Sequence, residues 1–430
     1  MKHLDLFPIT TKIQNNELTI AGCNLKKLID EFSTPLYIYD KATLDSSAIE
    51  YKNALASFYP QPASVTYAGK AYLCLAIAQW TQSHRLTLDC TGEGEIHIAL
   101  NAEVKRENIL VHGVNKSDSD LRSAIQHAGT IVVDNLLELE RISQRFTIHS
   151  SLNLWLRLLP GVTVSTHHAH TQTGHHASKF GMTRDEILEA ATFCKENNLP
   201  LNGLHFHQGS NFRDPEPLIA AIELALAIAK EINFEDEWHF CPGGGWGVAY
   251  HEDELPHPSI EHYVKGICEA VIEGCEKRNL SLPHLHLEPG RSLVARAGVA
   301  IYQVGAIKKR ENKTWVLVDG GMADNPRYAM YGARYSCLAV TGVSQERGEI
   351  ISVAGPYCES GDVIFEDLPM SKLKTGDLIA VPMSGAYHLS MSSHYNGARK
   401  PAVLMVENGN AKLIQKRETL DDLIRRDFKI

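Results

Sequence analysis

Residues 203–230, with the sequence GLHFHQGSNFRDPEPLIAAIELALAIAK, have the pattern of one complete strand-and-helix unit. The run 203–207 combines apolar and aromatic side chains and ends at a Gly-Ser turn, which predicts a strand. In 216–230 apolar residues recur on one face with Glu and Lys opposite, which predicts a helix that covers a sheet. Short β-rich runs and longer helical patterns alternate in this way from about residue 34 to residue 285, as is typical of parallel strands joined by helices.

The same alternation predicts a barrel. Further candidate strands in this span are residues 36–39, 64–67, 131–133, 152–158 and 284–288. Eight strand-and-helix units of a closed (β/α)8 barrel occupy about 250 residues, which is the length of the span 34–287. An α/β fold with a TIM-like barrel is therefore expected, and a doubly wound open sheet is the alternative.

A second, β-rich domain is predicted after the barrel. From about residue 288 the sequence changes to Val- and Ile-rich runs separated by tight turns, which favours antiparallel strands. The clearest runs are 314–318, 349–353, 378–381 and 402–406. A run at 18–23 precedes the barrel and is expected to join the C-terminal sheet. The predicted domains are thus a barrel of residues 34–287 and a β-sandwich or β-barrel domain of residues 1–33 plus 288–430.

Composition and charge argue against several classes of protein. The formal charge of −9 and the isoelectric point near 6.2 disfavour broad binding to nucleic acids or anionic membranes, which favour a basic surface. The sequence has no apolar run of the roughly 18 residues that suggest a membrane span, and its first residues lack the pattern of a secretory signal. The nine cysteines form no close CxxC pairs, so reduced thiols are expected. We therefore expect a cytoplasmic protein without nucleic-acid or membrane partners.

A lysine occupies a position suited to covalent chemistry. Lys70 lies in the segment YAGKAY (67–72), at the carboxyl end of a predicted strand, where barrel active sites are built. An amine at that position can form a Schiff base with a carbonyl cofactor. A strand-end lysine taken alone is more often a solvated charge, so the other segments decide between the two interpretations.

Other segments carry groups that suit a phosphorylated cofactor. HFHQGSN (205–211) offers imidazoles and a hydroxyl, and the glycines of CPGGGWG (241–247) let backbone N–H groups converge on an anion. EPGR (288–291) places a carboxylate and a guanidinium three residues apart, where they can meet a pyridine nitrogen and a phosphate. A core histidine, a flexible loop and a surface ion pair are the ordinary alternatives. CESGD (358–362) and SGAY (384–387), each taken alone, have the composition of an ordinary turn.

Together and in this order, these segments resemble the fold-type III pyridoxal-phosphate decarboxylases, and most closely the diaminopimelate decarboxylase branch. The resemblance runs from TPLYIYD (34–40) to RET (417–419), nearly the whole chain. It implies pyridoxal 5′-phosphate as cofactor and the alanine racemase-like fold, in which a barrel is joined to a C-terminal antiparallel β domain. It also implies a small amino-acid substrate and a homodimer with shared active sites.

The resemblance assigns roles to individual residues. Lys70 would carry the cofactor, His207 would stack on its ring, and Cys358 would donate a proton to the product; these three are the predicted catalytic residues. Glu288 would hydrogen-bond the pyridine nitrogen and keep it protonated. The implied cofactor-binding residues are Lys70, Asp89, His207, Ser210, Gly243, Gly244, Gly245, Glu288, Arg291 and Tyr387.

The substrate follows from the groups expected at its distal end. Diaminopimelate carries a second amino-acid head, so its site needs an arginine for the distal carboxylate and an acid for the distal ammonium. Arg327 and Tyr331 resemble the pair that binds the distal carboxylate, and Glu359 resembles the acid that binds the distal ammonium. Glu359 and Cys358 would both reach the active site of the neighbouring subunit. The implied reaction is decarboxylation of meso-2,6-diaminopimelate to L-lysine and CO2, the last step of lysine biosynthesis. The implied substrate-binding residues are Arg291, Arg327, Tyr331, Glu359 and Tyr387.

Two features need separate comment. Gly69 and Tyr72 flank Lys70 where the branch commonly has Val and Asn, so the packing beside the cofactor is expected to differ. The loop TGHHASKFG (173–181) resembles the corresponding loop of the branch. A cluster of histidines overlaps the start of this loop, and imidazole is a common metal ligand. Because no cysteine or carboxylate completes a ligand set, we expect a solvated loop and no metal. The cluster consists of His167, His168, His170, His175 and His176.

Three alternatives remain open. A decarboxylase for ornithine, arginine or carboxynorspermidine would share the mechanism, although Arg327 and Glu359 count against it. An amino-acid racemase would share the barrel and the lysine, but such enzymes place an arginine near the pyridine nitrogen, where Glu288 stands here. A cofactor-binding protein without turnover would share the fold, but the presence of Lys70 and Cys358 disfavours it.

Overall fold

The computed structural model describes residues 2–149, 151–161, 174, 178–234 and 237–430. The chain divides into two compact units, each built from more than one stretch of sequence. The barrel unit comprises Ala48–Val248 and Pro258–Ser292, and the β unit comprises Met1–Ser47, Ala249–His257 and Leu293–Ile430.

The barrel unit contains eight parallel strands whose hydrogen bonds close into a ring. The ring is completed where β12 pairs with β5, so the TIM-like barrel is confirmed and the open sheet is excluded. In chain order the strands are β5 (Ala63–Ala68), β6 (Thr87–Cys90), β7 (Ile109–Val111), β8 (Thr130–Val133), β9 (Asn153–Arg157), β10 (Leu201–His205), β11 (His239–Cys241) and β12 (His284–Leu287).

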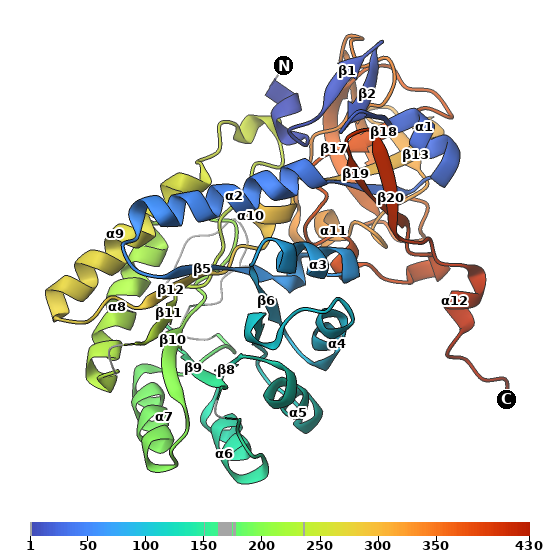
Figure 1. Ribbon diagram of the computed structural model, residues 1–430. Helices are drawn as coiled ribbons and strands as arrows, with labels where there is room; N and C mark the ends of the chain where they lie inside the picture. Colours follow the sequence, from blue (N-terminus) through green and yellow to red (C-terminus); the bar gives the residue numbers. More distant parts are fainter. Residues whose placement is uncertain (1, 150, 162–173, 175–177, 235–236) are drawn as a thin grey trace. The chain divides into compact units, whose positions relative to one another are not determined.

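Helices surround these strands in the ribbon view (Figure 1). The segment predicted from its apolar face is α8 (Glu216–Ile232), which buries Leu218, Ile222, Leu226 and Ile228. α7 starts at a capping box, because the Thr183 hydroxyl accepts from the backbone N–H of Glu186 and the Glu186 carboxylate accepts in return. Besides α8, the helices of the series are α2 (Lys41–Phe58), α3 (Leu75–Ser83), α4 (Glu93–Asn101), α5 (Asp118–His127), α6 (Leu136–Arg145), α7 (Arg184–Glu196) and α9 (Ile260–Arg278).

The β unit is organised around a nine-stranded, mostly antiparallel sheet. Only the pairs β14–β16 and β19–β4 are parallel. The strands are β4 (Leu36–Asp40), β13 (Gly298–Lys309), β14 (Thr314–Val318), β15 (Leu338–Ala339), β16 (Glu349–Ala354), β17 (Val363–Met370), β18 (Leu378–Val381), β19 (Ala402–Glu407) and β20 (Asn410–Gln415). The short helices α1 (Leu25–Phe32), α10 (Arg291–Val294), α11 (Arg327–Tyr331) and α12 (Leu420–Ile424) complete the assignment of helices.

The structure corrects the predicted boundary at residue 34. The predicted strand 36–39 exists as β4, but it pairs with β13 and β19 of the β unit, and all five of its residues are buried there. An apolar run that is buried on both faces fits a barrel strand and a central sheet strand equally well, so its pattern did not distinguish them. The barrel unit extends to Ser292, and Ala249–His257 belongs to the β unit.

The predicted strand at 18–23 also lies elsewhere than expected. It corresponds to β2 (Glu17–Ile20), which forms a separate three-stranded sheet with β1 (Lys12–Gln14) and β3 (Cys23–Asn24). It is linked to the C-terminal part of the unit by an antiparallel bridge between Glu17 and Thr341 and by a 2.9 Å hydrogen bond from the Leu18 N–H to the carbonyl of Val340. Leu18 and Ile20 lie in the unit's hydrophobic core, which explains their apolar character.

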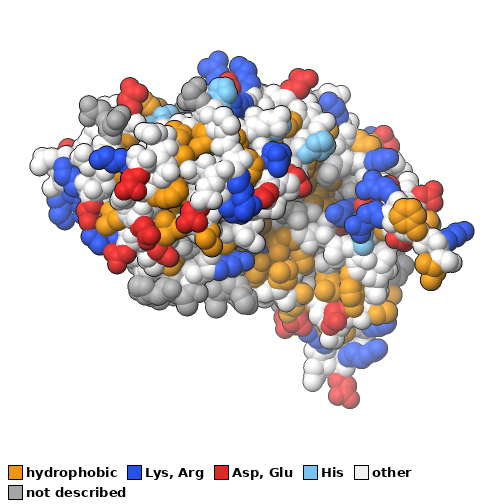
Figure 2. Space-filling view, turned by 90° about the horizontal axis from the view of Figure 1, so that it is seen from below, with side chains coloured by type: hydrophobic (Ala, Val, Ile, Leu, Met, Phe, Trp, Pro, Cys, Tyr) orange, Lys and Arg blue, Asp and Glu red, His pale blue; other side chains and the backbone are white. Residues whose placement is uncertain are grey.

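The surface charges, the helices and the cysteines can be compared with what the composition predicts. On the face drawn in Figure 2, basic and acidic side chains of the described residues are interspersed. None of the described helices combines the length and the apolar character that crossing a membrane requires. All nine cysteines are free thiols, and every one except Cys358 is buried.

Candidate active site

Lys70 lies at the carboxyl end of β5, in the 3-10 turn Gly69–Ala71. Its side chain is exposed, and its Nζ makes no hydrogen bond or ion pair within the described part of the chain. The amine is therefore available for a covalent bond to a carbonyl group.

Gly69 and Tyr72, which flank Lys70, are both tightly packed. A Cβ at position 69 would lie 2.6 Å from the carbonyl oxygen of Asp89 in β6, closer than side-chain carbons approach other atoms. Tyr72 is 3% exposed, and its carbonyl accepts a 2.5 Å hydrogen bond from the hydroxyl of Tyr67. These contacts hold the turn that carries the lysine against the neighbouring strand.

Glu288 directly follows β12 and is buried between two imidazoles. His112, just after β7, donates from Nε2 to Oε1 at 2.8 Å, and His205, the last residue of β10, donates from Nε2 to Oε2 at 3.0 Å. The two imidazole rings lie 4.4 Å apart by their centroids. Both carboxylate oxygens are thus fixed in position at the carboxyl end of the barrel, the end where barrel enzymes act.

Burial and hydrogen bonding set the charges of this cluster. Burial lowers the pKa of His112 to about 3 and also lowers the pKa of His205, so both rings are neutral donors at pH 7. Burial alone would raise the pKa of Glu288, but the two histidines hold it well below its usual value. Burial raises the pKa of Asp89, although the nearby Lys70 charge opposes this. Oδ1 of Asp89 is buried without a hydrogen-bond partner in the described part of the chain.

The glycines at 243–245 follow β11 and pack directly on neighbouring backbone. A Cβ at Gly244 would lie 1.9 Å from the carbonyl oxygen of Glu288. A Cβ at Gly245, where φ is +105°, would lie 2.3 Å from the carbonyl oxygen of Gly209. The N–H of Gly244 donates to Nδ1 of His207 at 3.3 Å, which fixes that ring as an acceptor at Nδ1. Burial lowers the pKa of His207 well below its usual value, so this ring is neutral as well.

Arg291 and Ser210 form a pair of anion-binding groups beside this loop. Nη2 of Arg291 donates to the Ser210 hydroxyl at 2.9 Å. Ser210 follows Gly209, on which the glycine loop packs, so the hydroxyl, the guanidinium and the loop belong to one assembly. A guanidinium, a hydroxyl and loop N–H groups are the donors that proteins use to bind phosphate.

In the β unit, Arg327 begins α11 and is held by aromatic residues. Its guanidinium lies 4.2 Å from the ring centroid of Tyr250 and donates a 2.5 Å hydrogen bond to the hydroxyl of Tyr335. The Tyr335 hydroxyl is 2.8 Å from Nε2 of His388, a buried ring whose pKa burial and the Arg327 charge lower. Tyr331 is half-buried one helical turn after Arg327, on the same side of the helix.

Cys358 and Glu359 lie on an exposed turn of the β unit. The Cys358 N–H donates to Oδ1 of Asn396 at 2.8 Å, and Glu359 Oε1 accepts 3.2 Å bonds from Ser360 and Gly361. Both side chains therefore face outward from their own chain. Tyr387 is half-buried, and its φ of 61° places it in the left-handed region.

The sequence prediction missed two residues at the carboxyl end of the barrel. His112 follows a strand of three residues, too short to give a pattern. Arg157 ends β9 and is buried, with its guanidinium 3.8 Å from Asp134 and 4.6 Å from the ring centroid of Phe180. A charged residue at the end of the apolar run 152–158 was the signal that could have identified it. The barrel unit does bring together the predicted Lys70, Asp89, His207, Ser210, Gly243, Gly244, Gly245, Glu288 and Arg291.

The predicted histidine loop lies outside the described residues. This applies to His167, His168, His170, His175 and His176.

Comparison with known proteins gives consistent sequence matches. The family described as "Pyridoxal-dependent decarboxylase, pyridoxal binding domain" matches residues 42–295. The diaminopimelate decarboxylase of Bacillus subtilis is 38% identical over 429 residues, which cover 96% of this chain and 96% of that protein. The diaminopimelate decarboxylase of a Synechocystis species is 36% identical over 445 residues, covering 98% of this chain and 93% of that protein.

Solved structures show the same similarity. The crystal structure of a diaminopimelate decarboxylase from Helicobacter pylori complexed with L-lysine has a TM-score of 0.83 and 32% identity, covering 94% of this chain and 98% of that chain. The corresponding structure from M. jannaschii has a TM-score of 0.88 and 29% identity, with 98% of both chains covered.

Proposed function

Because this chain belongs to the diaminopimelate decarboxylase family of pyridoxal-dependent decarboxylases, we propose that it converts meso-2,6-diaminopimelate to L-lysine and CO2. The cofactor is pyridoxal 5′-phosphate. The observation that carries the proposal is the ionised Glu288, fixed by two neutral imidazoles at the carboxyl end of a closed barrel. We place the reaction in the cytoplasm, at the last step of lysine biosynthesis, and the nine reduced thiols support that compartment.

The residues of the barrel unit fit pyridoxal phosphate. Oδ1 of Asp89 is a buried acceptor without a hydrogen-bond partner in the described part of the chain, and the exposed amine of Lys70 follows the strand beside it. An added Cβ at Gly244 or Gly245 would clash with neighbouring backbone, so the loop presents backbone and no side chains to a phosphate. Arg291 and Ser210 supply charge and a hydroxyl to the same anion.

Each chemical role follows from charge and geometry. The bound cofactor withdraws electron density from the substrate α-carbon through its protonated ring. Glu288 would keep the ring nitrogen of the cofactor protonated, because its carboxylate is held ionised by hydrogen bonds from His112 and His205. The neutral His207 offers a flat ring for stacking without adding a competing positive charge.

The proposed reaction breaks one carbon–carbon bond and consumes one proton. The bond between the α-carbon and its carboxylate breaks, the carboxylate leaves as CO2, and the electron pair stays on the α-carbon. One proton then adds to that carbon, so meso-diaminopimelate and a proton give lysine and CO2. We assign this proton to the thiol of Cys358, the only exposed cysteine of the nine.

The distal head of the substrate explains the polar residues of the β unit. Arg327 is buried, and its guanidinium is held by Tyr335 and Tyr250, so it is already oriented for a carboxylate. In the proposal Tyr331 and Tyr387 add hydroxyl groups, and Glu359 binds the distal ammonium. A substrate such as ornithine lacks the distal carboxylate and would leave the buried guanidinium uncompensated.

We further propose a homodimer in which Cys358 and Glu359 serve the partner subunit's site. Both residues are exposed and lie on a turn anchored by Asn396. A two-fold symmetric dimer would give two equivalent sites, each completed by the other chain.

The proposal is tested by CO2 release from the purified, cofactor-loaded protein. Meso-diaminopimelate, ornithine, arginine and lysine are assayed in parallel, with chiral analysis of the amino-acid products. Release from diaminopimelate alone, with L-lysine formed, is the expected result. Turnover of ornithine or arginine instead would refute the substrate, and racemisation without CO2 release would refute the reaction.

A further inference from the structure

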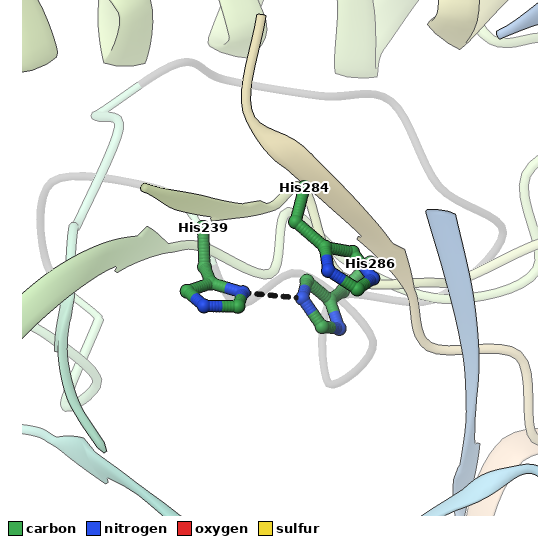
Figure 3. A group of neighbouring side chains, drawn as sticks. All are labelled: His239, His284 and His286. Atoms are coloured by element: carbon green, nitrogen blue, oxygen red, sulfur yellow. Dashed lines mark hydrogen bonds between the residues drawn. The ribbon is translucent and has the colours of Figure 1, made fainter. Parts of the chain in front are cut away.

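Three histidines lie together at the amino-terminal end of the barrel, away from the residues used by the proposed reaction. His239 begins β11, and His284 and His286 lie two residues apart on the adjacent β12. Figure 3 shows the three rings grouped between these strands. Glu288 lies two residues beyond His286 and four beyond His284, roughly 7 Å and 13 Å farther along the strand direction at about 3.3 Å per residue.

The rings are close enough to share one ion. Nδ1 of His239 and Nε2 of His286 form a 2.9 Å hydrogen bond, which a bound ion would replace, and the His284 and His286 rings stack with centroids 4.3 Å apart. One ring nitrogen from each residue can be chosen so that all three lie within 4.8 Å of one another. Two ligands of a tetrahedral zinc ion with Zn–N bonds of about 2.0 Å lie roughly 3.3 Å apart. Small ring rotations would therefore bring the three nitrogens into a coordination shell.

The surroundings of the cluster support a ligand site over an ordinary barrel core. Barrel interiors are usually filled by Val, Ile and Leu, whereas three imidazoles occupy this layer. His286 directs Nε2 toward His239, and its Nδ1 is buried without a hydrogen-bond partner in the described residues. The rings of His286 and His239 pack against Trp155, with centroid distances of 4.6 Å and 5.4 Å.

The ring of His284 is hydrogen-bonded to a serine hydroxyl. Metal-bound histidines commonly have such a hydrogen-bond partner on the ring nitrogen that does not bind the metal. The Ser64 hydroxyl, on β5 next to β12, lies 2.7 Å from Nε2 of His284. Burial also lowers the pKa of His239 to about 4 and the pKa values of His284 and His286, which leaves the rings in the neutral form that binds metals. His239 and His284 are partly exposed, so an ion can reach the cluster from solvent.

We propose that His239, His284 and His286 bind a divalent transition-metal ion of the zinc class, with water as the fourth ligand. The ion would join β11 to β12 at the amino-terminal end of the barrel, the end that contributes to stability in barrel enzymes. It would raise the thermal stability of the enzyme and leave its turnover unchanged.

The test uses Co2+ as a spectroscopic substitute for zinc in the full-length, cofactor-loaded protein after metal removal. One tightly bound Co2+ per chain with tetrahedral d–d bands and no thiolate charge transfer is expected, together with competition by Zn2+. His239→Gln and His286→Gln should each weaken binding at least about 100-fold, and Ser64→Ala by about 10–100-fold, the loss typical of an outer partner.

Controls separate this site from the other histidines of the chain. A variant with His167, His168 and His170 all changed to Gln should keep the cobalt spectrum, because the proposal assigns all three protein ligands to His239, His284 and His286. Equal binding by His239→Gln and wild type, or loss in the loop variant, would overturn the proposal. If the histidine variants do not fold, anomalous scattering from zinc-soaked wild-type crystals decides, since a peak among the three rings is required.

Discussion

His205 donates from Nε2 to Oε2 of Glu288 at 3.0 Å, while the opposite carboxylate oxygen accepts from a second imidazole at 2.8 Å. The carboxylate that faces the cofactor nitrogen in our proposal is therefore not free to rotate or to take up a proton. Each imidazole must remain neutral and protonated at Nε2 for this arrangement to hold. The charge that supports catalysis thus depends on two residues that do not themselves touch the substrate in the proposal.

Glu288→Gln should lower kcat by about 100-fold or more, because an amide cannot stabilise a protonated ring nitrogen as a carboxylate does. Cofactor content, measured by absorbance, should remain near one per chain, because the phosphate-binding groups are intact. A kcat within about threefold of wild type would remove the role assigned to this carboxylate.

His112→Asn should flatten the dependence of stability on pH between about 6.5 and 4.5. In the folded protein the pKa of His112 is lowered from 6.5 to about 3, so unfolding takes up a proton in this window and stability falls as pH drops. The full effect of one such group is about 1.4 kcal/mol per pH unit. Urea unfolding of both proteins at a series of pH values measures the slopes, which should coincide above pH 7.5. Equal slopes below pH 6.5 would contradict the buried neutral imidazole.

Gly69→Ala should impair the enzyme even though only a methyl group is added. The new Cβ would lie 2.6 Å from the carbonyl oxygen of Asp89, so the turn that presents Lys70 must move. A displacement near 1 Å costs up to about 100-fold in rate. Gly94→Ala is the matched control, because no atom lies within 4 Å of its Cβ position in α4; it should keep full activity and gain up to about 1 kcal/mol of stability. Equal activity of the two variants would show that the turn is not constrained.

Arg327→Ala should discriminate between substrates with and without a distal carboxylate. Loss of a hydrogen bond to a charged group costs about 1.5–3 kcal/mol, so kcat/KM for diaminopimelate should fall roughly 10–100-fold or more. Binding of the product L-lysine, which lacks that carboxylate, should change little when it is measured by inhibition of the reaction. Tyr335→Phe removes the 2.5 Å bond that orients the guanidinium, together with the 2.8 Å hydrogen bond to His388, and should cost about tenfold or less. Equal losses in diaminopimelate turnover and in L-lysine binding would remove the assignment of Arg327.

Mixing two inactive variants should restore activity if sites are shared between subunits. Lys70→Ala should lose cofactor absorbance and turnover, and Cys358→Ala should lose most turnover. After subunit exchange, a mixed dimer would contain one intact site, so an equal mixture should recover about a quarter of wild-type activity. Recovery of no activity, with exchange verified by mass spectrometry, would place Cys358 in its own chain's site.

The sequence predicted the barrel well because its longer strands and helices have clear periods. It did not recognise β7 and β11, which have three residues each, and these lead to His112 and the glycine loop. The glycines and Glu288 could still be found, because each stands in a compact motif of adjacent residues. His112 belongs to no such motif, and its partnership with Glu288 arises from the closure of the barrel. The sheet to which β4 belongs likewise depends on partners that are remote in the sequence.

β4 also has a consequence for how the protein is made. Its sequence, LYIYD, is buried on both sides by strands that begin at residues 298 and 402. A ribosome that adds roughly 5–20 residues per second needs tens of seconds to reach the first of them. During that interval a strand destined for the centre of a sheet has no native partner and is open to chaperones or to other chains. Correct assembly of the β unit must wait until synthesis is nearly complete.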